Sequence, residues 1–411
     1  MHIHLPMLLC KLLIIILCKI INIYYFTNIF FSILMSNKHK EIEDYIQNVY
    51  NFKKVWGKQC KKYDIEKQPH VLPPVKRIIV IGDIHGDWEM TQKLLKVAKL
   101  IDKNGDWIGT DTVVVQVGDQ IDRCRYKFGS GNPSCDKPEA TSPDEGNDWK
   151  ILQYFTKLHQ QATKVGGAVY SLMGNHELMN VQGDFRYVSY EGRREFINYK
   201  KPDGELIEDG DEARQWAFKP GNTISDFLAC TRQMALIIGS NLFVHAGVLP
   251  IIAKKYSVKS LNQLMSLYLW DKLDKPGEYN DVFFTSDVSP LWNRVFGNIG
   301  MQTLNESSKY LDLDEAKEKC SDLLNPLKEI YQVDKIYIGH TPLMDHGISS
   351  VCNGKVWLTD FGASKAFDKF DKSSTKSQST ESDTENHPRS STRKAQVLEI
   401  LDDGKEINIL Y

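Results

Sequence analysis

Short apolar runs that each end in glycine and metal-ligating residue types constrain this chain more than any other feature. Five such runs lead, in order, into Gly82-Asp83-Ile84-His85-Gly86-Asp87, Gly118-Asp119-Gln120-Ile121-Asp122-Arg123, Gly174-Asn175-His176-Glu177, Val244-His245-Ala246-Gly247 and Gly339-His340-Thr341-Pro342. Short apolar runs bounded by glycine predict buried strands. Asp, His and Asn are ligands for divalent metals. A lone histidine is usually packed or exposed, but five clusters in this arrangement predict one site at the strand ends.

The remaining chain alternates strand and helix patterns. Apolar runs predict strands at Ile78–Ile81, Val113–Val117, Ala168–Leu172, Met234–Ile238, Leu242–Val244, Ile336–Ile338, Val356–Leu358, Val397–Leu401 and Ile407–Leu410. Helical spacing of apolar residues predicts helices at Ile42–Trp56, Asp87–Leu100, Ile151–Ala162, Leu261–Leu273 and Leu313–Tyr331. This alternation predicts an α/β protein whose functional loops lie at the ends of its strands.

Composition places the chain among ordinary folded proteins. It has 411 residues, 42% hydrophobic and 25% charged, which is enough to bury a substantial core. The formal net charge of -2 comes from 51 basic and 53 acidic residues. A nucleic-acid partner is therefore not expected, because such proteins usually carry a basic excess or a basic stripe. An anionic substrate would have to be attracted by a local site.

The eight cysteines form no C-x-x-C pair, so a zinc ribbon is not expected. They stand at positions 10, 18, 60, 124, 135, 230, 320 and 352. A chain of this size does not need disulfides, and we expect reduced thiols in a cytosol-like compartment. Cys124 and Cys135 share one irregular loop and could pair, although we favour the unpaired state.

Residues 1–35 form a hydrophobic segment with two interpretations. It is long enough to cross a bilayer, and Lys38 and Lys40 follow it, which would leave the rest of a membrane-anchored chain in the cytoplasm. Translation of non-coding sequence before a true start at Met35 accounts for it equally well. We expect a cytoplasmic protein that contacts a membrane only through residues 5–35, if at all.

The chain after this segment divides by composition. Residues 36–75 are predicted to be a helical extension, and 76–411 a single catalytic domain. Within it, residues 371–392 are rich in Ser and Thr and nearly devoid of apolar residues, which predicts a disordered insertion.

The five motifs together resemble the calcineurin-like metallophosphoesterase superfamily, and its protein phosphatase branch in particular, with GDxHG, GDxxDR, GNHE, HxG and GHT. The resemblance covers roughly residues 76–363. Finer features are similar to the Shewanella-like protein phosphatases: Asp87, Leu178-Met179-Asn180, Ser289-Pro290-Leu291-Trp292-Asn293-Arg294 and Asp360-Phe361-Gly362. The implied fold is an αββα sandwich, two packed, mainly mixed β-sheets flanked by helices.

The resemblance also implies a role for each motif residue. One divalent metal would be held by Asp83, His85 and Asp119. A second would be held by Asp119, Asn175, His245 and His340, so that Asp119 bridges the pair. Arg123 and Arg294 would bind the phosphate, while His176, oriented by Asp122, would act as general acid. Manganese, iron and zinc all suit such ligands, with manganese expected to support activity in vitro.

These roles agree with the chemistry of phosphoester hydrolysis. Two divalent ions about 3.5–4 Å apart can share a bridging hydroxide that attacks phosphorus directly. Arginine offers the transferred group a planar, permanently charged fork, and a positioned acid typically contributes about 10²–10⁴-fold in rate. We therefore predict a serine/threonine-type protein phosphatase whose partner is a phosphorylated protein. A phosphotyrosine phosphatase, or a dinucleoside polyphosphate or RNA-cap pyrophosphatase, could use the same metal site. The oligomeric state is left open.

Two further positions bear on the substrate and leave every proposed ligand intact. Cys124 stands where the family usually has glycine after Asp-Arg, which predicts an unusual pocket rim. Pro342 occupies the last histidine position of the GHxH motif that is common in the nuclease branches, and this argues against a nuclease.

Overall fold

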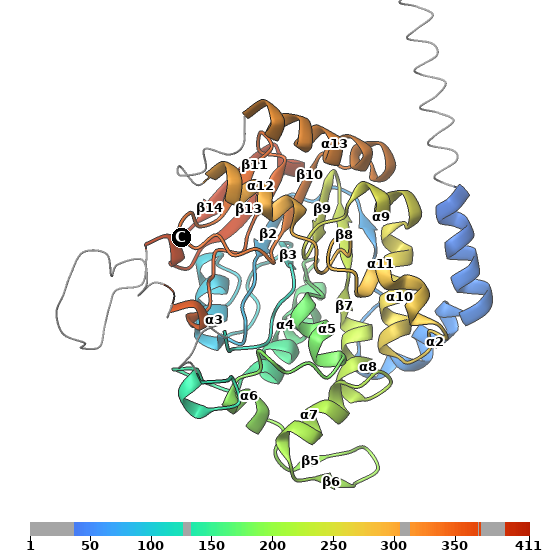
Figure 1. Cartoon of the computed structure of the whole chain (residues 1–411), viewed down its shortest axis with the longest axis vertical. Helices are drawn as coiled ribbons and strands as arrows, with labels where there is room; N and C mark the ends of the chain where they lie inside the picture. The colour runs from blue at the N-terminus through green and yellow to red at the C-terminus, as the bar shows by residue number, and fades with distance from the viewer. Residues whose placement is uncertain (1–36, 126–132, 305–312, 369, 371–390) are drawn as a thin grey trace, which may run out of the picture.

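The computed structural model describes residues 37–125, 133–304, 313–368, 370 and 391–411 (Figure 1). Its strands are β1 (Val71–Leu72), β2 (Arg77–Ile81), β3 (Val113–Gln116), β4 (Ala168–Leu172), β5 (Tyr199–Lys200), β6 (Leu206–Ile207), β7 (Arg232–Gln233), β8 (Ala235–Ile238), β9 (Asn241–Val244), β10 (Lys335–Ile338), β11 (Ser349–Val351), β12 (Val356–Leu358), β13 (Val397–Leu401) and β14 (Glu406–Leu410). Its helices are α2 (Phe52–Gln59), α3 (Trp88–Val97), α4 (Asp148–Thr163), α5 (Asn175–Val181), α6 (Tyr190–Arg194), α7 (Gly210–Phe218), α8 (Thr223–Thr231), α9 (Pro250–Lys255), α10 (Val258–Leu269), α11 (Asn280–Phe283), α12 (Val295–Leu304) and α13 (Leu313–Tyr331).

The strands form two six-stranded sheets and a small hairpin. One sheet has the order β14-β13-β2-β3-β4-β7, and the other β1-β8-β9-β10-β12-β11. Strands β2, β3 and β4 run parallel, with Ile79 opposite Val114 and Val114 opposite Val169. Every residue of β3 and β4 is buried, as expected of parallel strands covered on both faces. The carboxyl ends of β2, β3 and β4 therefore meet at one edge of the sheet.

The two sheets pack face to face with helices outside them, as Figure 1 shows. Leu236 of β8, Phe243 of β9 and Tyr337 of β10 belong to the same apolar cluster as β2–β4 and the helices α3 and α4. Helices α8, α10 and α13 contribute to a second cluster with the other face of the β8–β10 sheet. This arrangement confirms the predicted αββα sandwich.

The amino-terminal part differs from its prediction in two ways. The single helix predicted over Ile42–Trp56 is broken: residues 37–50 are helical, and α2 starts anew after Asn51. Asn51 has φ 47°, a left-handed conformation that asparagine tolerates well and that ends a helix. The extension also contains β1, which pairs with β8, so it is not helical throughout.

Other predictions fall outside the described residues. The hydrophobic segment 1–35 lies outside the described residues. So does the Ser/Thr-rich insertion, of which only residues 391–392 are described. Among the described helices, none has both the length and the apolar character that a membrane crossing requires.

Three disulfides among the described residues overturn the prediction of reduced thiols for six of the eight cysteines. They join Cys60 to Cys230, Cys124 to Cys135 and Cys320 to Cys352, with Cα–Cα distances of 5.3, 5.8 and 5.6 Å. The Cys60–Cys230 pair is separated by 170 residues. Spacing along the chain does not reveal such a pair, because the fold alone brings its members together.

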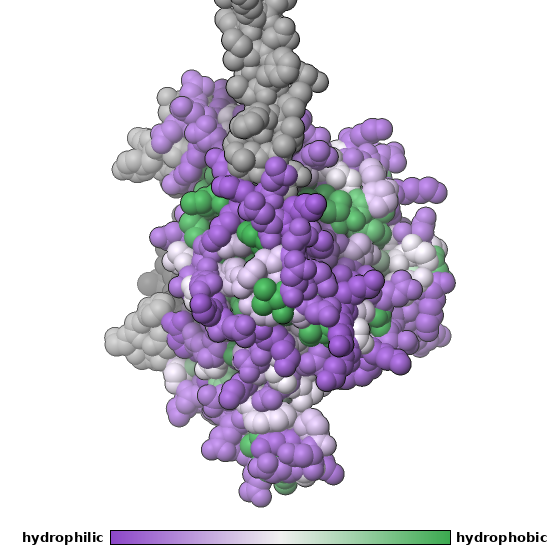
Figure 2. Space-filling view, turned by 90° about the vertical axis from the view of Figure 1, so that its right-hand side faces the viewer, coloured by the Kyte–Doolittle hydropathy of each residue, from purple (hydrophilic) through white to green (hydrophobic). Residues whose placement is uncertain are grey.

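The surface that carries α2 and residues 37–50 is mainly hydrophilic (Figure 2). Hydrophobic residues appear on this face in small, separate groups. The exposed large hydrophobic side chains include Tyr45, Val49 and Ile251. Scattered residues of this kind are usual on a protein surface and do not by themselves indicate a docking site.

Candidate active site

The five polar motifs converge because they follow strands that end at the same side of the sandwich. Asp83 and His85 follow β2, Asp119 follows β3, and the start of α5 follows β4. His245 and His340 follow β9 and β10, which are parallel neighbours in the second sheet. His85, Asp119 and His340 have φ values of 47°, 52° and 69°. Non-glycine residues rarely adopt such values, and they gather at functional sites.

Glycines beside the ligands allow the loops to approach each other closely. A side chain on Gly339 would collide with Asp83 Oδ1, and one on Gly174 would collide with Asp119 Oδ1. The glycines of the GHT and GNHE motifs are therefore required for space, since neither has a positive φ.

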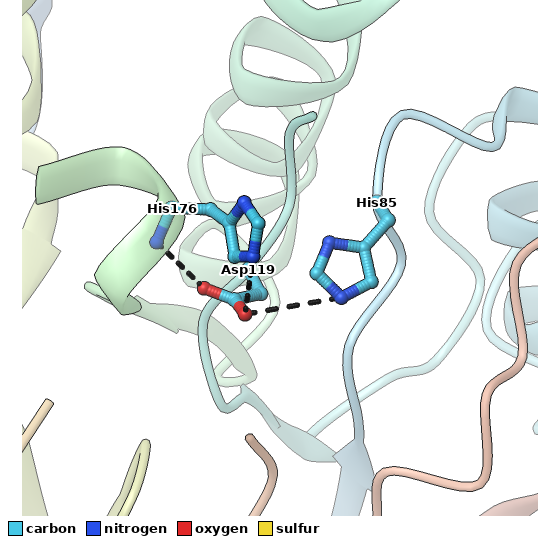
Figure 3. Close-up of side chains that lie close together, drawn as sticks. All are labelled: His85, Asp119 and His176. Carbon is cyan, nitrogen blue, oxygen red and sulfur yellow. Dashed lines mark hydrogen bonds and ion pairs between the residues drawn. The ribbon is translucent and has the colours of Figure 1, made fainter. Parts of the chain in front are cut away.

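Asp119 lies at the centre of the site. Its Oδ2 is 3.8 Å from Nε2 of His85 and 3.8 Å from Nε2 of His176, while its Oδ1 is 3.3 Å from Nε2 of His245. Figure 3 shows the neighbouring imidazoles of His85 and His176 both turned toward this carboxylate. Two groups of potential ligands share it: His85, Asp119 and His176, and Asp119, His245 and His340. A bridging role for Asp119 fits this geometry.

The tautomers of the histidines suit metal binding. His85 donates from Nδ1 to the carbonyl oxygen of Ile121 at 3.2 Å, and His245 donates from Nδ1 to that of Val117 at 2.9 Å. Because each ring donates one N–H to a carbonyl, its Nε2 lone pair is left for a metal. His340 uses the opposite nitrogen, donating from Nε2 to the carbonyl of Trp292 at 3.0 Å, which leaves Nδ1.

The remaining predicted ligands lie in the same place. Asn175 Oδ1 is 3.0 Å from Nε2 of His245. Asp83 Oδ2 is 3.9 Å from Nε2 of His85 and accepts a hydrogen bond from the backbone N–H of His340. All six ligands predicted from the motifs are thus brought together.

The carboxylates provide a test of whether a cation fits. Asp83, Asp119 and Asp360 are each 2% exposed. Burial raises the pKa of Asp83, and Asp360 and Asp119 raise it further. Asp83 Oδ1 is buried and has no hydrogen-bond partner among the described residues. Buried carboxylates need a compensating positive charge. Together with the imidazole nitrogens, this donor set fits a pair of divalent cations.

His176, the predicted acid, is held by a buried hydrogen-bond chain. Its Nδ1 lies 2.7 Å from Asp122 Oδ2, and Asp122 Oδ1 accepts from Asn180 Nδ2 at 2.8 Å. Arg214, 0% exposed, donates to Asn180 Oδ1 and to Asp148 Oδ2, both at 2.8 Å. The predicted pair of His176 and Asp122 is therefore supported by a hydrogen bond from Asn180, which Arg214 holds in turn.

Glu177 fixes the backbone of Asp119. Its carboxylate accepts hydrogen bonds from the backbone N–H groups of Asp119, Gln120 and Gly174, at 3.0, 2.7 and 2.7 Å. Burial, followed by the nearby Asp119, raises the pKa of Glu177 to about 7. Glu177, Asp148, Arg214 and Asp360 were not assigned roles from the sequence. Of these, only Glu177 and Asp360 lie in family motifs that could have drawn attention to them.

The two predicted phosphate-binding arginines have different surroundings. Arg294 donates to the carbonyl oxygen of His340 at 2.8 Å and lines the pocket over the ligands. Arg123 donates to Asp87 at 3.1 Å, to Ser364 at 2.6 Å and to the carbonyl of Pro143 at 3.2 Å. The guanidinium of Arg123 is thus engaged in a buried network, and its role at the phosphate stays a prediction.

A pocket of about 470 Å³ opens over the ligands. It is lined by Asn175, His176, Met179, Arg186, Tyr187, Ser286, Asp287, Trp292, Arg294, Val295, Asn298 and His340. An adjoining pocket of about 590 Å³ shares Arg186 and Tyr187 as walls. The predicted acid, two predicted metal ligands and two arginines, Arg186 and Arg294, therefore face one open cavity.

Known proteins have sequences similar to this one. The family model for calcineurin-like phosphoesterases matches residues 76–344. Shewanella-like protein phosphatase 2 of Arabidopsis thaliana is 29% identical over 321 residues, which cover 71% of this chain and 72% of the relative. Protein R398 of Acanthamoeba polyphaga mimivirus is 37% identical over 239 residues, or 53% of this chain and 90% of the relative.

Solved structures support the same fold. The structure of a cold-active protein tyrosine phosphatase has a TM-score of 0.54 at 18% sequence identity, covering 84% of this chain and 81% of the other. Because the match of the family model spans more than half of the sequence, and the predicted ligands meet at one site, the identification rests on both sequence and structure. The chain belongs to the calcineurin-like phosphoesterase family and is a metallophosphatase.

Proposed function

We propose that this chain is a protein phosphatase of the serine/threonine type. The observation that carries the proposal is the buried His176–Asp122 pair facing Asp119, with its Nδ1–Oδ2 distance of 2.7 Å. A serine or threonine side chain leaves as a poorly stabilised alkoxide and needs a proton at the moment of cleavage. A tyrosine side chain leaves as a better stabilised phenolate, so its departure depends less on protonation. A held acid is therefore worth most on alkyl phosphate esters.

The remaining residues supply binding and orientation. The bound divalent cations would supply the activated water and neutralise charge on the phosphoryl oxygens. Asp83, His85, Asp119, Asn175, His245 and His340 would hold them. Arg294, which donates to the carbonyl oxygen of His340 and lines the pocket, would bind a phosphate oxygen there. Manganese, iron and zinc all suit this ligand set, and manganese is the metal we propose for assays.

The shape of the site supports a protein substrate. The pocket over the ligands adjoins the second pocket through Arg186 and Tyr187, and together they give room for residues beside a phosphorylated side chain. The relatives named protein phosphatases are consistent with a phosphoprotein partner. A cytoplasmic location stays a prediction, and the three disulfides count against it because they are typical of oxidising compartments.

A phosphotyrosine phosphatase is the second candidate. Tyr187 and Trp292 line the pocket and could pack against a substrate ring, and the solved structural neighbour is named a tyrosine phosphatase. A pyrophosphatase acting on dinucleoside polyphosphates would use the same metal ligands, but no described contact favours it.

The full chain with manganese should release phosphate from p-nitrophenyl phosphate, lose this activity with a chelator, and lose nearly all of it in Asp119→Asn. Matched peptides with phosphoserine, phosphothreonine or phosphotyrosine, and a diadenosine polyphosphate, then separate the candidates. Higher kcat/KM on phosphoserine or phosphothreonine peptides is expected. Preference for the nucleotide would overturn the proposal, and activity that survives complete metal removal would overturn the mechanism.

A further inference from the structure

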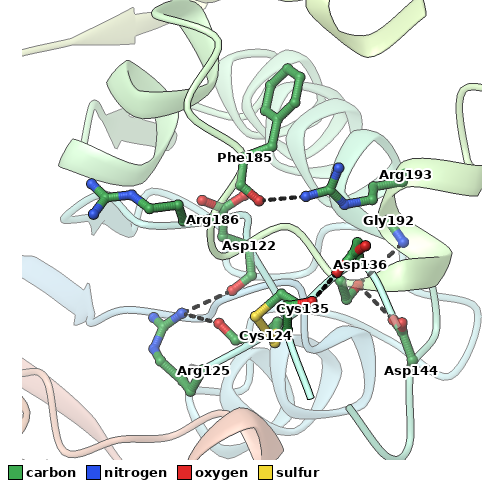
Figure 4. The surroundings of a disulfide bond; sticks show 12 residues. Asp122, Cys124, Arg125, Cys135, Asp136, Asp144, Phe185, Arg186, Gly192 and Arg193 are labelled. Atoms are coloured by element: carbon green, nitrogen blue, oxygen red, sulfur yellow. Dashed lines mark hydrogen bonds between the residues drawn. A yellow bond between two sulfur atoms is a disulfide. The ribbon is translucent and has the colours of Figure 1, made fainter. Parts of the chain in front are cut away.

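Arg125 is a buried cation at the active site that no family motif assigned. Its exposed fraction is 9%. It lies two positions after Arg123, directly following Cys124 (Figure 4). Its hydrogen bonds within the described residues run from Nη1 to the carbonyl oxygens of Asp122 and Cys124, at 3.1 and 2.9 Å. No carboxylate lies within ion-pair distance of it in the part of the chain that is described. A buried guanidinium without an ion-pair partner is energetically costly unless an anion binds to it.

Aromatic rings fix the direction of this guanidinium. It lies 4.8 Å from the centre of the Phe367 ring and 5.6 Å from that of Tyr187. Phe367 packs on the predicted metal ligand His85, and Tyr187 packs on the acid His176, with ring centres 5.7 and 5.0 Å apart. Arg125 is thereby held between the neighbours of a ligand and of the acid.

The buried carboxylates of the site act on the charge of Arg125. Burial lowers the pKa of Arg125, while the carboxylates of Asp119, Asp122, Asp360 and Asp83 act in the opposite direction. Burial is the largest of these influences, so the nearby carboxylates compensate the cation only in part. The metal ions would neutralise the same carboxylates, and Arg125 would then need an anion of its own.

Arg123 differs from Arg125 because a carboxylate pairs with its guanidinium. Its exposed fraction is 2%, and its Nη1 and Nη2 groups donate to the carboxylate of Asp87, the hydroxyl of Ser364 and a backbone carbonyl. Its Nε is buried and has no hydrogen-bond partner among the described residues. Releasing it toward a phosphate would break these bonds and leave Asp87 without its ion-pair partner.

We infer that Arg125, and not Arg123, is the guanidinium that binds the substrate phosphate on the His85 side of the site, opposite Arg294. This inference rests on the proposed phosphatase function and names a further residue for it. The phosphoryl group would then lie between two arginines, one beside His85 and one anchored on the backbone of His340. Arg123 is instead a structural residue that ties the loop after β3 to Asp87 and Ser364.

Titration of the manganese-loaded full chain with inorganic phosphate tests the inference without relying on turnover. Arg125→Met keeps the aliphatic part of the side chain but removes the guanidinium. We expect its Kd for phosphate to rise about 10- to 100-fold, as for a lost charge-assisted hydrogen-bonded pair. Arg125→Lys should fall between this variant and the wild type, because it keeps the charge without the fork. Both should still bind two manganese ions.

Two further variants complete the comparison. Arg123→Met should lower the melting temperature, but its folded form should bind phosphate within about threefold of the wild type. Arg194→Met, whose side chain is 50% exposed on α6, is the surface control and should change neither property.

Phosphate binding by Arg125→Met within about threefold of the wild type, or selective loss of binding in Arg123→Met, would overturn the inference. If Arg125→Met does not fold, Arg125→Lys decides, and unchanged phosphate affinity in that variant is then the overturning result. A wild-type chain that binds phosphate but hydrolyses no phosphoester would refute the proposed function and leave the binding comparison readable.

Discussion

Asp122→Asn removes one negative charge while keeping the size of the side chain. The exposed fractions of Asp122 and His176 are 0% and 7%, so solvent screens their interaction weakly. The carboxylate is 2.7 Å from His176 Nδ1 and stabilises the imidazole when it carries both protons. An amide of the same shape cannot do so. The variant should therefore lose the general acid and little else.

The size of the loss depends on the leaving group. A positioned acid contributes about 10²–10⁴-fold, or about 3–5 kcal/mol of the barrier. We expect kcat for phenyl phosphate and for a phosphoserine peptide to fall about 10²–10³-fold in Asp122→Asn. The loss on p-nitrophenyl phosphate should be less than about 10-fold, because p-nitrophenolate departs without needing a proton.

Steady-state assays of both aryl phosphates with manganese measure this difference directly. Asp226→Asn is a matched control, since Asp226 is also buried, at 6% exposure, and accepts a hydrogen bond from Tyr63 at 2.8 Å. Its ratio of rates on the two substrates should equal that of the wild type. Equal losses on both substrates in Asp122→Asn, with two manganese ions still bound, would show that Asp122 does not act through proton donation.

Three other perturbations test the surroundings of the site. Gly339→Ala would push a methyl group against Asp83 and should weaken manganese binding about 10- to 100-fold in a metal titration. Gly277→Ala is the control, because its methyl group meets nothing within 4 Å, and it should leave manganese binding unchanged. Burial lowers the pKa of His159 to about 4, so the unfolded chain gains a proton that the folded protein lacks as pH falls through 6.5. In urea unfolding, the free energy of unfolding of the wild type should therefore fall by up to about 3 kcal/mol between pH 6.5 and 4, relative to His159→Asn. Cys230→Ser opens a disulfide that spans 170 residues and should cost about 2–5 kcal/mol of unfolding free energy under non-reducing conditions; a change within error would show that the bond adds nothing.

The central strands and the convergence of the predicted ligands were predictable for one physical reason. Parallel strands covered on both faces need continuous apolar residues, and β3 shows this with Val113, Val114 and Val115. Such runs are visible in a sequence, and the polar residues at their ends stand out against them. The same reasoning fails for β7, whose two residues Arg232 and Gln233 are buried but polar. Strand pairing there depends on the neighbouring β4 and leaves no apolar pattern.

The support behind the acid could not be predicted because its members share no spacing. Asp148 begins α4, Asn180 lies on α5 and Arg214 lies on α7, and only the folded chain brings them into one hydrogen-bond network. Their types also gave no signal, since charged residues on helices are usually exposed. The partners in the Cys60–Cys230 disulfide were hidden in the same way, whereas Cys124 and Cys135 share one loop.

The loop after β3 shows why a motif can predict the metal ligands while the phosphate contact that we propose lies just outside the motif. Asp119 is held by backbone bonds to Glu177, and this depends on how β3 and β4 end, so the motif predicts it well. Beyond Asp122 the path changes: Cys124 replaces the usual glycine, is joined to Cys135, and donates its N–H to the carbonyl of Tyr187 at 3.0 Å. A residue at position 125 is then directed inward between aromatic rings. The metal ligands follow from the ends of the strands, whereas the phosphate contact follows from the route of this loop. A loop of this kind can therefore alter substrate binding in a metallophosphatase while every metal ligand stays in place.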